Sequence, residues 1–172
     1  PLDDIQDNQH AGINADYMAI FEERIGVPIN LLPTKSWTES LQAVRAGQCH
    51  IIALAAHTPQ RDEFLLFTDS YVNIPFVVVT TQEKFFVSKL SDLIAKDLGV
   101  NEGYAYNDLI KNRWPEVNLV EVETTKEGLD KVSSGEIFGF LSGLNMAGYS
   151  IQTGGYTNLK INGQFDELEM IE

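Results

Sequence analysis

The sequence predicts an α/β protein that folds as two lobes. Short apolar segments rich in β-branched residues alternate along the chain with segments of helical period. Such alternation predicts parallel sheets covered by helices on both faces. The alternation breaks near residues 80–82 and then restarts, so we expect one lobe over residues 1–81, a second over residues 82–172 and a hinge at the break. A chain of 172 residues is long enough to bury a core of this kind.

The expected first lobe begins with a helix over residues 14–26, with Asn14 as its N-cap and Gly26 as its end. A second helix, over residues 36–47, opens with the Ser-x-x-Glu pattern of a capping box and ends at a glycine. The apolar runs are expected to form strands, at residues 29–32, 50–56 and 74–81.

The expected second lobe repeats the alternation four times. Helices are predicted at residues 90–99, 103–114, 124–135 and 144–152. Strands are predicted at residues 98–101, 118–123, 137–141 and 158–161. Pro115 stops the second of these helices, and a Thr-x-x-Glu capping box opens the third.

Composition narrows the possible functions. The chain carries 25 acidic and 12 basic residues, a net charge of −13. This balance argues against nucleic acid and anionic membrane surfaces as partners, because both need a basic patch. No apolar run approaches the roughly 20 residues that span a bilayer. The single cysteine, Cys49, is expected to be buried and inert.

We expect no catalytic residues, no cofactor and no metal site. The sequence contains no P-loop and no Ser-His-Asp order, and His10, His50 and His57 lack the spacing of zinc ligands. His57 follows a predicted strand and is either an exposed loop histidine or a group that senses pH or contacts ligand. A non-enzymatic binding domain is therefore the favoured interpretation.

Ligands of open α/β sheets bind beyond the carboxyl ends of strands, often against helix N-termini. Three stretches follow predicted strands in this way: "HTPQR", which ends at Arg61, "NEGYAY", which contains Gly103, and "SGLN", which begins at Ser142. Two lobes that present such ends to each other would form a binding cleft.

The chain resembles the bacterial extracellular solute-binding proteins of family 3, which have the type 2 periplasmic binding, or Venus flytrap, fold. The resemblance lies in "SWTESLQAVRAGQCHIIALAAHTPQRDEFLLFTDSYV", with its Thr-x-x-Arg and Phe-Thr-x-x-Tyr patterns, in "LSDLIAKDLGVNEGYAYNDLI" and in "SSGEIFGFLSGLNMAGYSI". The N-terminal 29 residues and "GYTNLKING" are most similar to the sensor branch, found in membrane histidine kinases and diguanylate cyclases. The resemblance implies one more strand before the chain's start and a return to the first lobe after its end, so we expect an incomplete first lobe.

The resemblance also implies site residues. Arg61 matches the arginine that binds the ligand carboxylate; the alternative is a surface arginine beside Asp62 or Glu63. Trp37 matches the aromatic residue that covers the ligand; the alternative is a core position on a helix face.

Asn101, Tyr104 and Ala105 match the loop of the second lobe, whose backbone amides complete the carboxylate site. Gly103 is expected to be needed for its backbone conformation.

Two positions depart from the family pattern. The hydroxyl that holds the ligand's amino group would stand at Ala56, and its acidic partner at Gly143, next to Ser142. Both holders of the amino group are missing, so we predict a small carboxylate-bearing ligand and not an α-amino acid bound in the usual way.

The predicted function is an extracytoplasmic, periplasmic sensor domain that binds this ligand in the cleft between the lobes. Its partners would be membrane-anchored signalling domains in the same full-length chain. The main alternative is the receptor of an ABC uptake transporter for amino acids, with a permease as its partner. A periplasmic dehydratase-like enzyme is a third interpretation, although no acid or base stands at a matched cleft position.

Overall fold

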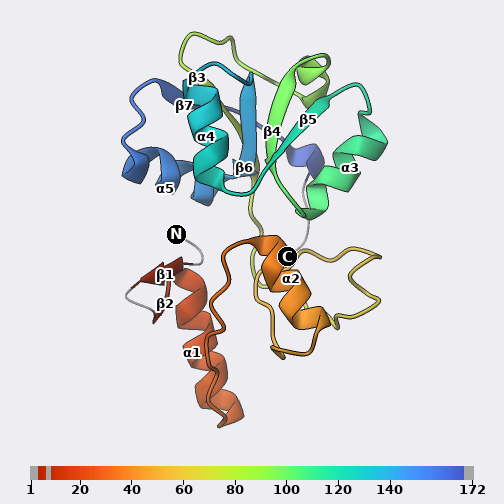
Figure 1. The fold of residues 1–172 in the computed structure, drawn as a ribbon, viewed down its shortest axis with the longest axis vertical. Coiled ribbons are helices and arrows are strands. Elements are labelled where there is room, and N and C mark those ends of the chain that lie inside the picture. Colours follow the sequence, from red (N-terminus) through yellow and green to blue (C-terminus); the bar gives the residue numbers. More distant parts are fainter. Residues whose placement is uncertain (1–3, 7–8, 169–172) are drawn as a thin grey trace. The chain divides into compact units, whose positions relative to one another are not determined.

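The computed structural model describes residues 4–6 and 9–168, and the chain divides into two compact units, residues 1–55 and 56–172 (Figure 1). The division does not coincide with the predicted boundary after residue 81. Strand β3 (Phe76–Thr81), which we expected in the first lobe, pairs with two strands of the second unit. Thr80 and Thr81 are buried in β3, so the predicted hinge region belongs largely to a central strand.

The described residues of the first unit form two short strands and two helices. Strands β1 (Asp4–Gln6) and β2 (Gln9–Ala11) pair antiparallel, a hairpin that the sequence did not predict. Helix α1 (Ile13–Ile25) ends as predicted, because Gly26 adopts a left-handed conformation and donates its N–H to the carbonyl of Glu22. Its start differs from the prediction: Gly12 takes the N-cap position, and Asn14 is a buried residue of the helix.

Helix α2 (Trp37–Arg45) begins where its capping signal predicts. The Ser36 hydroxyl accepts a hydrogen bond from the Glu39 N–H at 3.3 Å. The Glu39 carboxylate accepts from the N–H of Lys35, one residue before the cap. The predicted strands at residues 29–32 and 50–56 are wrong, since both segments are irregular. A strand needs a partner along its length to satisfy its backbone groups, and no described segment pairs with either of them.

The second unit is built on one five-stranded sheet with the order β5-β4-β6-β3-β7. Strand β4 (Asp97–Asn101) pairs parallel with β5 (Asn118–Val122) and β6 (Gly139–Gly143). Strand β3 runs antiparallel to β6 and to β7 (Leu159–Gln164). The sheet is therefore mixed, and the expectation of a parallel sheet is wrong for its β3–β7 side.

Helices cover both faces of this sheet (Figure 1). Alternate residues of β3 enter opposite core clusters, Val78 on one face and Val77 and Val79 on the other. Helix α3 (Ala105–Arg113) packs on the Val78 face, and α4 (Thr125–Ser133) and α5 (Leu144–Gly154) pack on the other. The predicted helix at 90–99 is only a 3₁₀ turn, η1 (Leu90–Leu93), and a second turn, η2 (Asp166–Leu168), follows β7.

Two glycines of the second unit make a matched test of this packing. A Cβ at Gly163 in β7 would collide with the backbone carbonyl of Val87, which cannot swing away as a side chain can. Gly163→Ala is expected to lower the free energy of unfolding by about 1–3 kcal/mol. Gly148→Ala in α5 meets no atom within 4 Å and should raise it by about 0.5–1 kcal/mol. Urea unfolding followed by circular dichroism measures both, and equal midpoints for the two variants would contradict the β7 packing.

Candidate functional site

Arg61 is a buried residue, with 6% of its surface exposed. Its Nη1 donates to the carbonyl of Ala56 at 2.6 Å, and its Nη2 donates to the carbonyl of Gly103 at 3.3 Å. This burial contradicts the alternative of a surface arginine. The side chain of Asp62 pairs with His57, whose Nε2 lies 2.7 Å from Oδ1 of Asp62. The guanidinium therefore lies beside the turn that precedes α3.

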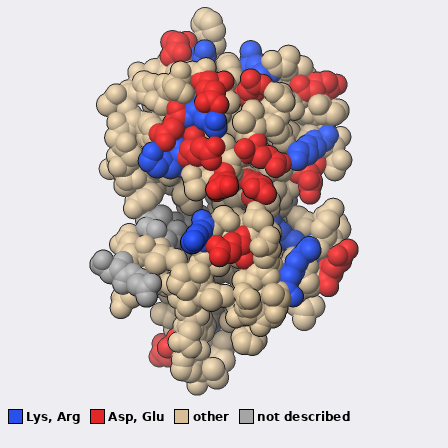
Figure 2. All heavy atoms as spheres, viewed as in Figure 1, with Lys and Arg blue, Asp and Glu red and all other residues tan. Residues whose placement is uncertain are grey.

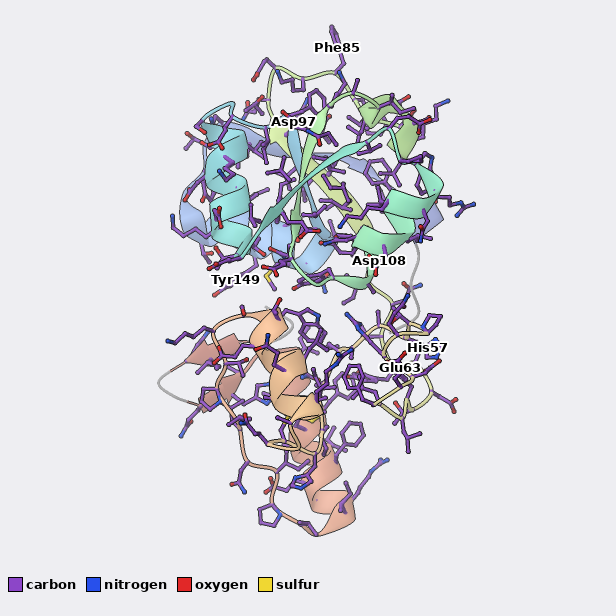
Figure 3. All side chains as sticks on the ribbon, turned by 45° about the vertical axis from the view of Figure 1, so that its right-hand side comes forward. His57, Glu63, Phe85, Asp97, Asp108 and Tyr149 are labelled. Carbon is purple, nitrogen blue, oxygen red and sulfur yellow. The ribbon has the colours of Figure 1, made fainter. Side chains whose placement is uncertain are left out.

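The segment around Arg61 is a series of turns. The backbone N–H of Arg61 donates to the Thr58 carbonyl at 2.9 Å, and the Thr58 hydroxyl lies 3.3 Å from the same nitrogen. Thr58 thus caps the turn that leads to Arg61. His57 and Glu63 extend from this segment (Figure 3), and His57 is an exposed loop histidine, with its ring edge-on to Phe67 at 4.9 Å.

The loop between β4 and α3 contains a glycine in the left-handed conformation. Gly103 has a φ of +74°, so the prediction that this position needs glycine for its conformation is confirmed. Tyr104 follows in extended conformation at the N-cap position of α3. Its ring packs 5.4 Å from that of Tyr106, which is fully buried. The start of α3, where the helix dipole favours an anion, therefore lies next to the Arg61 contact.

Asn101 ends β4 and is 5% exposed. Its Nδ2 donates to the hydroxyl of Thr125, the first residue of α4, at 3.2 Å. Its backbone carbonyl accepts from Nδ2 of Asn107, in the first turn of α3, at 2.8 Å. One asparagine thus joins the end of a strand to the beginnings of two helices.

The end of β6 is closed by apolar packing. Ser142 is 3% exposed, and Gly143 takes the N-cap position of α5. A Cβ at position 143 would lie 2.8 Å from Cγ2 of Ile74. The acidic side chain that the resemblance implies at this position is therefore replaced by glycine in contact with an isoleucine that is itself 8% exposed.

The second unit brings together most of the predicted site residues. Hydrogen bonds join Arg61 to Ala56 and Gly103, while Asn101 and Gly143 end two neighbouring parallel strands. Trp37 lies in the first unit, as the partly buried first residue of α2.

Sequence reasoning missed three residues of this edge: Ile74, Asn107 and Thr125. The available signals were weak. Thr125 directly follows a capping threonine, and Asn107 lies in the first turn of a predicted helix.

Acidic side chains dominate the surface charge of the chain, which has a net charge of −13. Figure 2 shows Asp and Glu residues spread over the face that it draws, with Lys and Arg among them. A buried arginine in such a protein sets a local potential of the opposite sign, which favours an anionic group close to it.

The chain belongs to the bacterial extracellular solute-binding proteins, family 3, whose family model matches residues 1–136. Among curated proteins, it is 22% identical to the virulence sensor protein BvgS of Bordetella pertussis over 130 residues, which are 76% of this chain. It is 25% identical over 154 residues to membrane-bound lytic murein transglycosylase F of Alcanivorax borkumensis, covering 85% of this chain. The chain spans 10% of the length of the first relative and 32% of the second.

Solved structures confirm the predicted Venus flytrap fold. The periplasmic VFT2 domain of B. pertussis BvgS superposes with a TM-score of 0.84 at 21% identity, covering 96% of this chain and 71% of that domain. An ancestral arginine-binding protein bound to arginine gives a TM-score of 0.83 at 20% identity, covering 95% of this chain and 74% of that protein. No helix within residues 4–6 and 9–168 is long and apolar enough to cross a membrane.

The contact between Gly143 and Ile74 can be tested by a double-mutant cycle. Gly143→Ala should lower the free energy of unfolding by about 1–3 kcal/mol, because the new methyl group meets Cγ2 of Ile74. In an Ile74→Ala background the same change should cost much less, giving a coupling of about 0.5–3 kcal/mol. Urea denaturation of the four proteins supplies the numbers. Additive effects would show that the two residues do not pack together.

Proposed function

We propose that this chain is the solute-binding part of an extracytoplasmic, periplasmic sensor in a membrane signalling protein. Its ligand is a small carboxylate-bearing molecule, bound where β4 and β6 end. The observation that supports this most is the buried guanidinium of Arg61 beside the turn at Gly103.

A carboxylate suits this position for two reasons. A guanidinium offers a planar fork of donors that matches the two oxygens of a carboxylate. The N-terminus of α3 directly follows the same turn, and its backbone N–H groups and dipole favour a negative charge. In this proposal Tyr104, at the N-cap position of α3, provides aromatic cover for the body of the ligand.

The proposal concerns binding and not catalysis. The family is described by solute binding, and the similarity to a lytic transglycosylase extends over only 32% of that protein.

A transporter receptor is the second candidate. It is favoured by the structural similarity to an ancestral arginine-binding protein. The two candidates predict different continuations of the full-length polypeptide. A membrane-spanning segment followed by a kinase or cyclase domain would identify the sensor, and a free receptor without such domains would identify the transporter.

Arg61→Ala is expected to abolish or strongly weaken ligand binding. A thermal-shift screen of small carboxylates on the full chain first identifies a binder, since a ligand at 100 times its Kd stabilises a protein by about 2.7 kcal/mol. Calorimetric titration then measures the loss, which should be about 2–5 kcal/mol for a buried charged partner. Arg61→Lys keeps the charge but not the fork and should give an intermediate loss.

Arg113→Ala is the matched control, because Arg113 is exposed on α3 and stacks on the ring of Trp114 at 5.2 Å from its centroid. It should leave affinity unchanged. Affinity within twofold of the wild type for a folded Arg61→Ala variant would refute the proposed carboxylate site.

A further inference from the structure

The side chain of Asn101 carries a buried oxygen with no partner. Oδ1 accepts no hydrogen bond from any residue in the described part of the chain, although Asn101 is only 5% exposed. Proteins leave few buried acceptors unpaired, because such a group loses its water without a replacement. The described residues therefore leave this oxygen available as an acceptor for a bound molecule.

The unpaired oxygen is held in place by its surroundings. The other end of the same amide donates to the Thr125 hydroxyl at 3.2 Å, which restrains rotation of the side chain. The Asn101 carbonyl accepts from Asn107 at 2.8 Å. Asn107 is 3% exposed, and its own Oδ1 also accepts nothing from the described residues. Two preorganised acceptors thus lie at the junction of β4 with α3.

This junction is the same strand end that carries the Gly103 turn, two residues after Asn101. Resting on the carboxylate site proposed above, we infer that Asn101 Oδ1 accepts a hydrogen bond from a hydroxyl group of the ligand. The ligand class is then a hydroxycarboxylate, with Arg61 binding its carboxylate and Asn101 its hydroxyl. Thr125 is a positioning residue that orients the amide.

A hydroxyl, which donates one hydrogen bond, fits the single oxygen of Asn101 better than an ammonium group does. An amide oxygen is neutral, and a buried ammonium needs several acceptors or a negative charge. The position at the end of β6 supplies no carboxylate, since Gly143 packs against Ile74. Glu102, the acid next to Asn101, is exposed to water, where its attraction to a ligand cation is weak.

The test compares sets of three acids that share one carbon skeleton and differ only at the second carbon. The probes are propionate, lactate and alanine; glutarate, 2-hydroxyglutarate and glutamate; and 3-phenylpropionate, phenyllactate and phenylalanine. Calorimetric titration of the full chain should give a hydroxy acid that binds roughly tenfold tighter than its deoxy analogue, as expected for one hydrogen bond to a buried acceptor. The matching amino acid should bind more weakly than the hydroxy acid.

Two substitutions of Asn101 separate the role of this oxygen from that of Arg61. Asn101→Leu, of similar size, should reduce the preference for the hydroxy acid over the deoxy acid to within twofold. Asn101→Asp introduces a negative acceptor and should improve the affinity for the amino acid relative to the hydroxy acid by roughly tenfold. Thr125→Val removes the hydroxyl that restrains the amide and should reduce the preference in part, while leaving the deoxy acid unaffected.

Asn112→Leu makes the same change at an exposed position of α3 and should alter no affinity. Circular dichroism establishes whether each variant is folded. If Asn101→Leu is unfolded, the test relies on Asn101→Asp and Thr125→Val. An unchanged preference in the folded variants, or a wild type that binds amino acids best, overturns the role of Asn101. If affinity in those cases still depends on Arg61, the carboxylate site stands; if none of the acids binds, both proposals fail.

Discussion

The antiparallel insertion of β3 between β6 and β7 determines where the candidate site lies. Phe76, the first residue of β3, pairs with Gly143, the last residue of β6. The chain therefore enters this sheet at the edge where β4 and β6 end, and the segment that carries Arg61 arrives at that edge. If β3 ran parallel to its neighbours, it would enter at the opposite edge. The segment between Arg61 and Phe76 would then have to cross the sheet before Arg61 could contact the carbonyl of Gly103.

Helices α3, α4 and α5 of the second unit and the strands between them could be predicted because their signals are local. The Thr124 hydroxyl accepts from the Glu127 N–H at 3.2 Å, as the capping pattern requires. Strand direction could not be predicted in this way, because it depends on pairing between segments far apart in sequence, such as β3 and β7. The failed strands at residues 29–32 and 50–56 have the same cause: an apolar run supplies β propensity, but a partner decides whether a strand forms.

The same distinction between local signals and long-range contacts applies to the residues of the candidate site. Arg61 and Gly103 stand in short sequence patterns that indicate a role by themselves, and Gly103 has the predicted conformation. Thr125 meets Asn101 across 24 positions of sequence, and nothing local to a threonine in a helix start indicates that contact. Ile74 belongs to a run of apolar residues with an obvious role in a strand, so its contact with Gly143 is visible only in three dimensions.

The two positions that depart from the family pattern, Ala56 and Gly143, are both occupied by packed protein atoms. At Ala56 the residue is buried and its carbonyl accepts a hydrogen bond from Arg61. At Gly143 the space that a side chain would need is taken by Ile74. An acid at position 143 would therefore require a compensating change at Ile74, because a packed core does not yield to one added group without cost. Asn101 is different: its amide already lies at the strand end, and a carboxylate of almost the same shape could replace it. In the proposed site, a negative charge opposite a second ligand group would therefore be easier to introduce at the end of β4 than at the end of β6.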